Sequence, residues 1–332
     1  MKERKDMQDV VVSTRIRLAR NIRNLPFPHK LSGEEEIYSV LYDGVQKACD
    51  ELFNSKFYAV NKLDELTGQT LVEKHLISPD LLSSKYGAVI VSDTEDISIM
   101  LNEEDHIREQ CFVRGYGLQK AYDNIKKVDR KLAEKLDIAH DEKYGYLNTC
   151  PTNLGAGMRA SVMLFLPCLT MTGGVWTFIS KYKELGFTTR GVYGEGSEAE
   201  GFMYQISNQA AIGSSEQEIL NKMDILVTKL VDAERIARSN LVKNKGMDIK
   251  DEIMRAYGVL KYACKMSSKE FMEKLALVKL GVIEGYIDTD FDKLNQLIVL
   301  SQPAMLCSLA GKKLNAEGRD VTRSALIKKM LD

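Results

Sequence analysis

Residues 150–161 place a thiol, two glycines and an arginine within one short stretch, which reads Cys-Pro-Thr-Asn-Leu-Gly-Ala-Gly-Met-Arg-Ala-Ser. Glycines allow a tight turn in which the backbone comes close to a ligand. The planar guanidinium of Arg159 can hold a phosphate through two parallel hydrogen bonds, and Cys150 could supply a reactive thiolate. Taken alone, the stretch is more typical of a structural turn before the apolar run at 162–166, because short glycine motifs recur by chance.

Two further segments carry arginines that suit a phosphate site. In the segment 11–20, Val-Val-Ser-Thr-Arg-Ile-Arg-Leu-Ala-Arg, Arg15 and Arg17 are two residues apart and would face the same side of a strand. The segment 190–195 reads Arg-Gly-Val-Tyr-Gly-Glu and combines an arginine, two glycines and a carboxylate. Either segment alone is more often a solvated surface.

An acidic run follows a predicted hairpin. Alternating apolar residues at 88–91 and 97–101, joined by a polar turn at 93–96, indicate two antiparallel strands. The next residues, 102–108, read Asn-Glu-Glu-Asp-His-Ile-Arg and bring carboxylates together with an arginine. Such a run usually forms a polar loop, so it indicates a functional site only in combination with the other segments.

Together and in this order, the four segments resemble those of the phosphagen kinases, the family of creatine and arginine kinases, and in particular its bacterial branch that phosphorylates arginine in proteins. The resemblance is strong over about residues 11–210 and looser beyond. It implies an α+β fold, an antiparallel β-sheet flanked by helices of the glutamine-synthetase-like type, followed by an all-helical C-terminal domain that dimerises. Small-substrate members carry a helical domain before the first motif. Here twelve residues precede Ser13, so we expect an open site that accepts a protein.

The resemblance also implies an ATP site, with Mg²⁺ held through ATP and no metal site of the protein's own. The implied nucleotide-contacting residues are Ser13, Thr14, Arg15, Ile16, Arg17, His75, Arg108, Arg159, Ala160, Ser161, Val162, Met163, Arg190, Gly191, Val192, Tyr193, Gly194 and Glu195. Phosphoryl transfer is mainly positioning and charge stabilisation, so the five arginines of this set would compensate the phosphate charges. His75 is equally well explained as a packing or surface histidine.

The acceptor chemistry points to carboxylates. A guanidinium group has a pKa above about 12 and is a poor nucleophile, so the site must grip its planar fork and accept a proton as the N–P bond forms. We expect Glu104 to be the base and Glu195 the second clamp. Cys150 resembles the active-site cysteine of the family, whose thiolate could hold a guanidinium nitrogen.

Three residues depart from the family pattern. Ala156 stands where threonine is usual, Phe165 where the protein-kinase branch usually has histidine, and Ser324 where alanine is usual. The change at Ala156 could loosen a hydroxyl contact near the nucleotide, and that at Ser324 could alter a pocket. Neither Ala156 nor Phe165 replaces a charged catalytic group, so we expect activity.

A C-terminal motif resembles the one with which protein-arginine kinases recognise phosphoarginine away from the active site. Its residues are Arg319, Asp320, Val321, Thr322, Arg323 and Ser324. On a helix the two arginines are four apart and face the same way. The carboxylate could hold a guanidinium while the arginines hold a phosphate. The alternative is an ordinary charged helix start.

The chain changes character near residue 210. Beyond it, helical periodicity dominates, with an apolar face at Ile219, Met223, Leu226, Leu230, Ala233 and Ala237. Ser267 and Glu270 resemble a capping box, and the segment 288–290 could start another helix. We expect a catalytic domain at 11–235 and a helical domain at 236–332, which would carry dimerisation and phosphoarginine binding.

Composition narrows the classes of partner. The 332 residues include 46 basic and 47 acidic ones, so no global electrostatic attraction to nucleic acid or membrane is implied. No apolar stretch would span a bilayer, and the first residues lack the apolar core of a signal peptide. The six cysteines are scattered, which fits a reducing cytoplasm better than disulfides or a metal site.

Motifs of rival enzyme classes are weak or missing. The sequence has no Gly-x-x-x-x-Gly-Lys-Ser/Thr phosphate loop, and neither His-Arg-Asp nor Asp-Phe-Gly of the eukaryotic-type kinases. The segment 194–199 matches a dinucleotide fingerprint on paper, but its two acidic residues would repel a pyrophosphate and no βαβ pattern surrounds it.

We therefore expect a cytoplasmic, homodimeric, ATP- and Mg²⁺-dependent kinase of arginine residues exposed on proteins. The resemblance implies that such marks direct misfolded proteins to a Clp-type protease and inactivate a heat-shock repressor in the stress response. An activator protein and a Clp ATPase are the implied partners. The alternatives are a kinase of free arginine or another small guanidino compound, and a non-catalytic phosphoarginine-binding regulator. The presence of Glu104, Cys150 and Glu195 argues against the regulator.

Overall fold

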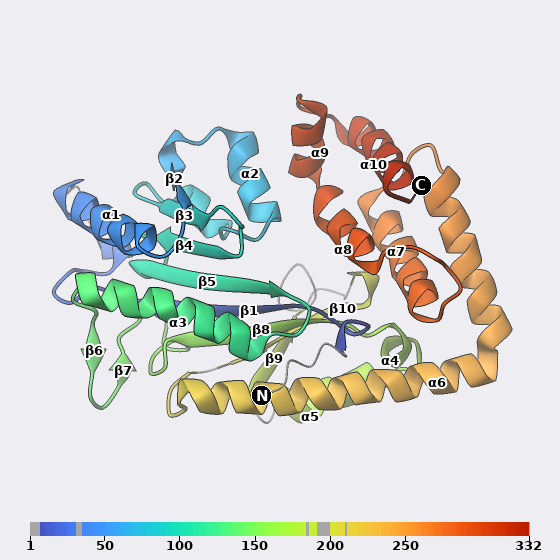
Figure 1. Cartoon of the computed structure of the whole chain (residues 1–332), viewed down its shortest axis with the longest axis horizontal. Helices are drawn as coiled ribbons and strands as arrows, with labels where there is room; N and C mark the ends of the chain where they lie inside the picture. The colour runs from blue at the N-terminus through green and yellow to red at the C-terminus, as the bar shows by residue number, and fades with distance from the viewer. Residues whose placement is uncertain (1–6, 31–34, 184–185, 191–199, 210, 332) are drawn as a thin grey trace.

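The computed structural model describes residues 7–30, 35–183, 186–190, 200–209 and 211–331. Its centre is an antiparallel sheet with the strand order β2-β3-β4-β5-β1-β8-β10-β9 (Figure 1). The strands are β1 (Val11–Arg20), β2 (Ser55–Ala59), β3 (Ala88–Ser92), β4 (Ile97–Leu101), β5 (Ile107–Arg114), β8 (Met158–Phe165), β9 (Phe187–Arg190) and β10 (Met203–Asn208). A separate small ribbon pairs β6 (His140–Asp141) with β7 (Gly145–Tyr146).

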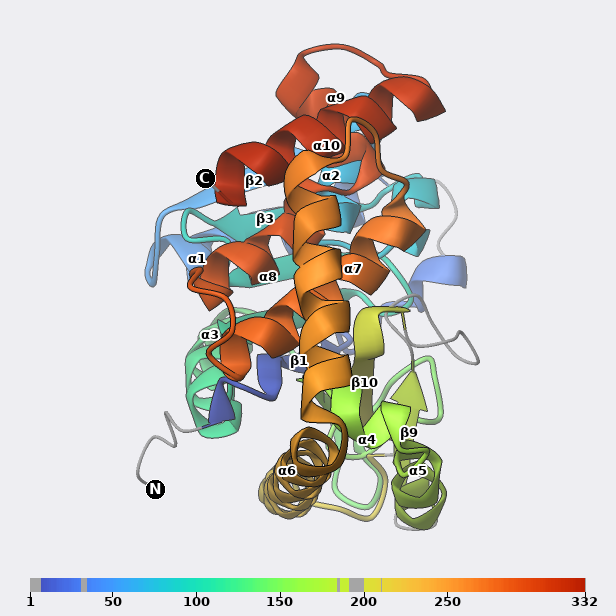
Figure 2. The ribbon, with the colours of Figure 1, turned by 90° about the vertical axis from the view of Figure 1, so that its right-hand side faces the viewer.

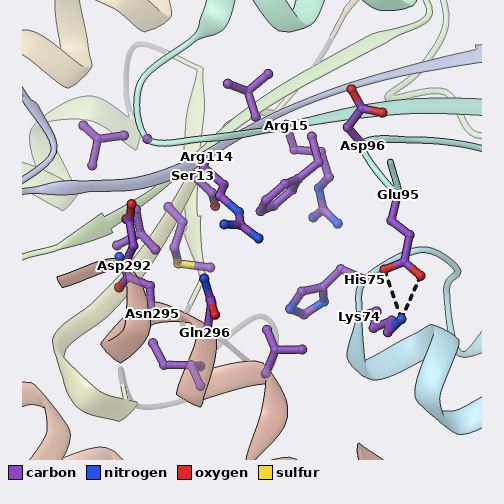
Figure 3. A pocket seen from close by; sticks show the side chains of 18 of the residues that line it. Ser13, Arg15, Lys74, His75, Glu95, Asp96, Arg114, Asp292, Asn295 and Gln296 are labelled. Carbon is purple, nitrogen blue, oxygen red and sulfur yellow. Dashed lines mark hydrogen bonds and ion pairs between the residues drawn. The ribbon is translucent and has the colours of Figure 1, made fainter. Parts of the chain in front are cut away.

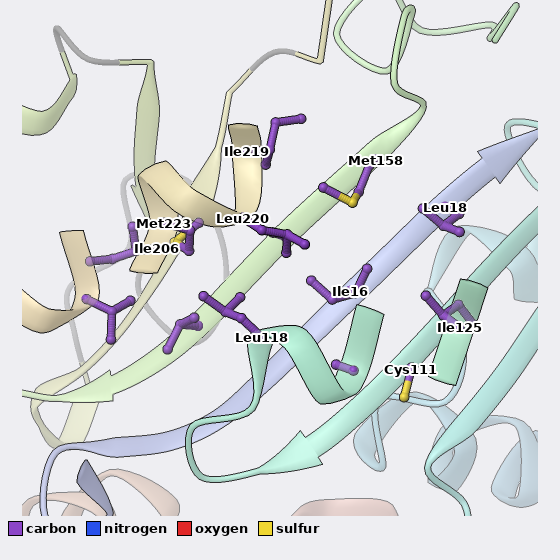
Figure 4. Packing of buried hydrophobic residues seen from close by; sticks show 14 of the residues in the cluster. Ile16, Leu18, Cys111, Leu118, Ile125, Met158, Ile206, Ile219, Leu220 and Met223 are labelled. Carbon is purple, nitrogen blue, oxygen red and sulfur yellow. The ribbon is translucent and has the colours of Figure 1, made fainter. Parts of the chain in front are cut away.

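One face of the sheet is covered by helices. The covering helices are α1 (Glu35–Asp50), α3 (Leu118–Lys135) and the first half of α6 (Glu216–Tyr262), while α4 (Pro167–Met171) and α5 (Val175–Lys183) lie near β9 (Figure 1). Ile16 and Leu18 of β1 point into this layer and are fully buried, packed with residues of β5, β8 and α3 (Figure 4). This apolar burial is the main force that holds β1 in the middle of the sheet.

The predicted hairpin is confirmed. Strands β3 and β4 pair in antiparallel register, with Ala88 opposite Leu101, and the polar turn lies between them. Both strands are buried along their whole length, because α2 (Glu65–Glu73) and its flanking turns cover the far face with a second, smaller apolar cluster. The acidic run therefore starts from a rigid strand end.

The C-terminal third packs as a layer of helices beside the sheet. It consists of the second half of α6 with α7 (Ser268–Ile283), α8 (Phe291–Leu300), α9 (Pro303–Ala310) and α10 (Ala316–Leu331) (Figure 2). Ser267 caps α7 by accepting a hydrogen bond from the Glu270 backbone, and Asp290 caps α8. The predicted helix starts at both positions are confirmed.

The helix α6 runs through the expected boundary at 235/236. Its first half contributes Leu226 and Val231 to the core under the sheet, and its second half contributes Ile253 and Leu260 to the helical layer. Between them, at Lys245, the backbone leaves the helical region, with φ −136° and ψ 28°. The two cores are thus joined by one helix that bends, and the proposed division into two domains stays a prediction.

A carboxylate ties the helical layer to the sheet half. The backbone N–H groups of Ala304 and Met305 donate to the two oxygens of Glu73, both at 2.8 Å. These N–H groups begin α9 and have no partner within their own helix, so an acceptor at this end is stabilising. Glu73 ends α2, two residues before His75.

A charged cluster lies buried between the sheet and α3. Arg20 donates from Nε and Nη2 to the carboxylate of Asp129 at 2.7 and 3.1 Å, and its guanidinium lies 3.5 Å from the ring centre of Tyr146. Glu109, fully buried beside this pair, has its pKa raised well above the usual value by burial and by the charge of Asp129, against the opposing effect of Arg20. Burial thus favours the neutral, protonated form of Glu109.

Replacing Glu109 by glutamine should make the free energy of unfolding less dependent on pH. Because the folded-state pKa is raised, the stability due to its protonation is present below the unfolded pKa near 4.5 and is lost as pH rises through the folded pKa. Between the unfolded and the folded pKa, the free energy of unfolding of wild type should fall by up to about 1.4 kcal/mol per pH unit relative to that of Glu109→Gln. Urea unfolding between pH 5 and 8 measures this difference. The exposed Glu142→Gln serves as control and should follow wild type; parallel curves for Glu109→Gln would contradict the neutral form.

Candidate active site

Four arginines lie on the face of the central strands that is turned away from α3 and the first half of α6. Arg17 of β1 stands directly opposite Arg159 of β8, and Ala19, two residues further along β1, stands opposite Arg108 of β5. Directly opposed residues share a face of the sheet, as do residues two apart in a strand. Arg15, Arg17, Arg108 and Arg159 therefore form one group, which we call the arginine row. The expectation that Arg15 and Arg17 share one side of an extended segment is confirmed.

The charges of the arginine row repel one another. Burial, and then the positive charges of Arg108 and Arg159, lower the pKa of Arg15 to about 10. A positive group whose charged form is disfavoured by its neighbours is matched by an anion of several charges, because each negative charge relieves this repulsion. Phosphate suits guanidinium groups in particular, since it accepts two parallel hydrogen bonds.

A large pocket opens at the Arg15 end of the row. It has a volume of about 930 Å³, and among its lining residues are Ser13, His75, Ser161 and Met163 (Figure 3). His75 is held with φ 60° in the turn after α2, where Gln110 Nε2 donates to its carbonyl at 2.6 Å. Burial and then the charge of Arg15 lower the pKa of His75 to about 4, so its imidazole is neutral at pH 7.

A second pocket lies at the Arg108 end. It has a volume of about 590 Å³ and is lined by Asp80, Lys85, Glu103, Glu104 and Arg108, among others. Arg108 Nη1 donates to both oxygens of Glu103 at 2.7 Å, so this carboxylate neutralises the arginine. Glu104 is exposed beside the pair. Partial burial and the charges of its acidic neighbours raise its pKa, which makes it a stronger base.

The buried Asp105 brings Cys150 close to the acidic run. It accepts hydrogen bonds from Asn21 Nδ2 at 2.6 Å and from the Thr149 backbone at 2.8 Å. The Thr149 hydroxyl in turn donates to the Glu104 carbonyl at 2.9 Å. The residue after Thr149 is Cys150, whose sulfur contacts the Thr152 hydroxyl at 3.0 Å. Glu104 and Cys150, which are 46 residues apart in the sequence, are thus held near each other through Thr149.

The glycine turn of residues 155–157 packs against the protein's own backbone and side chains. Gly157 has φ 57°, and a Cβ there would lie 2.5 Å from Arg20 Nη1 and 2.9 Å from the Ala19 carbonyl. Gly155, with φ 102°, faces the backbone of Ile212 at 2.8 Å in the same way. The two glycines therefore let the turn pack closely against the end of β1 and the backbone at Ile212. This packing fixes the place of Arg159, which follows in β8.

Alternation along the strands divides the expected nucleotide set between the two faces of the sheet. Thr14, Ile16, Ala160 and Val162 are fully buried on the helix-covered side, so their side chains point away from the arginine row. The Thr14 hydroxyl donates to the carbonyl of Gly115. The expected set includes consecutive residues of β1 and β8, but only every second side chain of a strand points to the face that carries the arginine row.

The last expected motif is described only at its first residue. The backbone of Arg190 pairs with Gln205 of β10, which stands opposite Met163 of β8. Gly191, Val192, Tyr193, Gly194 and Glu195 lie outside the described residues.

The C-terminal motif occupies the first turns of α10. Arg323 is buried and donates to the carbonyls of Ser301 at 3.1 Å and Met266 at 2.7 Å, and to Asp320 at 2.7 Å. Arg319 is half-buried and donates to the Leu314 carbonyl. In this structure Asp320 thus forms an ion pair with Arg323 of the same helix. Arg319 and Arg323 are four residues apart and lie on one side of α10, whereas the side chain of Val321 is exposed.

The three departures from the family pattern have local partners. Ser324 is buried, and its hydroxyl donates to the Ala263 carbonyl. The ring of Phe165 lies 4.3 Å from the ammonium nitrogen of Lys279, a buried lysine of α7. Ala156 packs against the core under the sheet. None of the three contacts is part of the arginine row.

The described residues form neither a membrane-spanning helix nor a metal-binding cluster. None of their helices is both long and apolar enough to cross a membrane. No group of three or more histidine, cysteine or acidic side chains among them is arranged to hold a metal ion.

Two sequence families match the chain in succession. Residues 36–237 match the ATP:guanido phosphotransferase, C-terminal catalytic domain, and residues 246–332 match the protein-arginine kinase McsB C-terminal domain. The two matches meet within α6, on either side of Lys245.

Full-length relatives carry a uniform name. The protein-arginine kinase of Caldanaerobacter subterraneus subsp. tengcongensis is 42% identical over 98% of this chain and 98% of its own length. That of Clostridium kluyveri is 44% identical over 97% of this chain and 94% of its own.

Solved structures of similar fold include lombricine kinase, with a TM-score of 0.61 and 24% identity over 70% of this chain and 68% of that one. The duplicated taurocyamine kinase from Schistosoma mansoni, with bound transition state analog components, has a TM-score of 0.60 and 26% identity over 68% of this chain and 33% of that one.

Replacing Gly157 by alanine should destabilise the fold beyond the cost of its backbone angle. A left-handed non-glycine residue costs about 1–3 kcal/mol, and here the added Cβ would also displace Arg20 from its buried pair. Gly173→Ala is the matched control, since Gly173 has φ 73° but nothing within 4 Å of its Cβ position. Thermal unfolding of both variants measures the difference. Equal losses would contradict the close approach at Gly157.

Proposed function

Because this chain belongs to the ATP:guanido phosphotransferase family, and within it to the protein-arginine kinases, we propose that it transfers the γ-phosphoryl group of ATP to arginine side chains of protein substrates through the arginine row. The observation that carries this proposal is the order along β1 and its neighbours. The large pocket lies at Arg15, the row continues through Arg17, and the second pocket lies at Arg108 beside Glu104. A donor and an acceptor can therefore meet over a positive surface.

The nucleotide occupies the large pocket in this proposal. Its base and ribose lie among Ser13, His75 and Met163, and its phosphates extend along the arginine row toward Arg108. Mg²⁺ comes with ATP, since this ion prefers phosphate oxygens and keeps several of its waters. The guanidinium groups supply the remaining compensation for the charge spread over the transferred group. Arg190 joins the set through its place on β9, as the resemblance of its motif implies.

Glu104 acts as the base for the acceptor. Attack by a guanidinium nitrogen forms the N–P bond, breaks the bond between the γ-phosphorus and the bridging oxygen, and releases ADP. The proton of the attacking nitrogen passes to Glu104, whose raised pKa favours accepting it. Glu103 already compensates Arg108, so it keeps this arginine in place without taking the proton. Cys150 holds a second guanidinium nitrogen, and Glu195 is the further clamp that its motif implies.

The finer biological role is also a proposal. Arginine marks would direct misfolded proteins to a Clp-type protease and inactivate a heat-shock repressor, with an activator protein and a Clp ATPase as partners, in the cytoplasm and as a homodimer. The support is the resemblance of the whole chain to protein-arginine kinases. The motif at 319–324 would bind phosphoarginine, and its support is the ion pair of Asp320 with Arg323, together with Arg319 four residues earlier on the same helix.

Incubation with ATP and Mg²⁺ tests the function directly. Casein should acquire acid-labile phosphate, whereas free arginine should remain largely unmodified. Glu104→Gln should lower the transfer rate by about 10²–10⁴-fold, because the base is lost, while ATP binding stays near wild type. In wild type the rate should fall as pH drops through the raised pKa of Glu104, since the protonated carboxyl cannot accept a proton.

The exposed Glu142→Gln is the control and should keep the wild-type rate. A Glu104→Gln variant that retains more than about a tenth of the rate would remove the base role. Efficient transfer to free arginine with none to casein would replace the protein substrate by a small guanidino compound.

Asp320→Ala should abolish activation by phosphoarginine. Free phosphoarginine is expected to raise the initial rate of wild type on a small peptide, because binding at α10 favours an active state. In the variant the basal rate should stay near normal, since Arg323 keeps its two carbonyl acceptors. Glu317→Ala, an exposed change in the same helix turn, should respond like wild type. Equal responses of Asp320→Ala and wild type would leave the motif as an ordinary helix start.

A further inference from the structure

The large pocket has a second wall, which comes from the helical layer. One side of the pocket is the sheet with Ser13 and Arg15, and the other side is α8. Figure 3 shows Asp292, Asn295 and Gln296 of α8 across the pocket from Arg15 and His75. Together with Val299, which also lines the pocket, these residues follow the three- and four-residue spacing of one helix face. One face of α8 is therefore turned toward the pocket, while Leu294 and Leu297 pack into the core of the helical layer.

Asn295 stands out on this face because its amide is incompletely satisfied. The side-chain oxygen Oδ1 is buried and has no hydrogen-bond partner among the described residues. Buried polar atoms in proteins nearly always have a partner, since an unpaired one loses its hydration without compensation. An unpaired amide that borders a cavity is best explained by a partner that the cavity's occupant supplies.

The chemistry of the surroundings limits what that occupant presents to Asn295. Asp292, one turn earlier on the same face, carries a negative charge and would repel a phosphate. The positive groups that suit phosphates lie on the sheet side, at Arg15 and beyond. What faces α8 is therefore a neutral part of the nucleotide with a hydrogen-bond donor. An amide that offers an acceptor and a donor side by side matches the amino group and ring nitrogen at the edge of adenine.

We propose that Asn295 binds the adenine edge of ATP, so that α8 of the helical layer forms part of the nucleotide site. This inference rests on the proposed function, which assigns the large pocket to ATP. The position of α8 is fixed at its end, where the Ser301 carbonyl accepts from Arg323 and where α9 begins on Glu73. The same carboxylate ends the helix that precedes His75, so Glu73 links the segment that carries His75 to the helix that follows α8.

The test is the dissociation constant of three nucleotides, measured by calorimetry on wild type, Asn295→Ala and the control Lys293→Ala, without an acceptor. Lys293 is exposed on the outer face of α8. Asn295→Ala should weaken ATP binding by about 3–10-fold, the usual worth of one or two hydrogen bonds. Inosine triphosphate lacks the adenine amino group, so wild type should bind it more weakly and Asn295→Ala should change its affinity little. Lys293→Ala should bind all three as wild type does.

The third nucleotide, 2′-deoxy-ATP, separates the base from the ribose. Asn295→Ala should weaken it as much as ATP. A variant that loses discrimination against 2′-deoxy-ATP instead of inosine triphosphate would overturn the assignment to adenine. Unchanged affinities in Asn295→Ala, with wild type binding ATP, would overturn the role of Asn295 alone. A wild-type protein that binds none of the nucleotides would overturn the proposed function, and this inference with it.

Discussion

The gathering of positive charge on one face of a sheet is the constraint on which the site depends. Arg15, Arg17, Arg108 and Arg159 come from three strands, and both burial and mutual repulsion disfavour their charged forms, as the lowered pKa of Arg15 shows. The cost is met on the other face of the same strands, where Ile16 and its neighbours bury apolar surface under α3 and α6. Because strand residues alternate, the β1 side chains that enter this core, such as Ile16 and Leu18, also fix the direction of Arg15 and Arg17.

Carboxylates divide the remaining work between structure and chemistry. Glu103 compensates Arg108, and Asp129 compensates Arg20 on the buried side. Asp105 is used as an anchor for the loop that carries Cys150. These three hold fixed partners, whereas Glu104 is exposed at the second pocket with a raised pKa. A base needs this combination, since a carboxylate held in an ion pair would resist protonation.

The sequence alone was enough for features that depend on local pattern. The two-residue spacing of Arg15 and Arg17 predicts their common face, and the hairpin follows from alternation and a polar turn. Features that depend on tertiary partners could not be predicted. Within the acidic run nothing local distinguishes Glu103 from Glu104, because the difference lies in the reach of Arg108. Likewise, no pattern in residues 291–300 indicates a pocket wall, since the opposite wall is almost 300 residues away in sequence.

Hydrogen bonds of Arg323 connect α10 to the end of α8. Arg323 divides its guanidinium among Asp320 and two carbonyls, of which the one at Ser301 lies at the end of α8. A ligand that draws Asp320 away would leave Arg323 with carbonyls alone, and its charge would then be less well compensated. One of those carbonyls lies at the end of α8, and one face of α8 borders the large pocket. If the proposed function holds, a ligand at Asp320 and a nucleotide in the large pocket would thus border the same short helix, one at its end and one at its face.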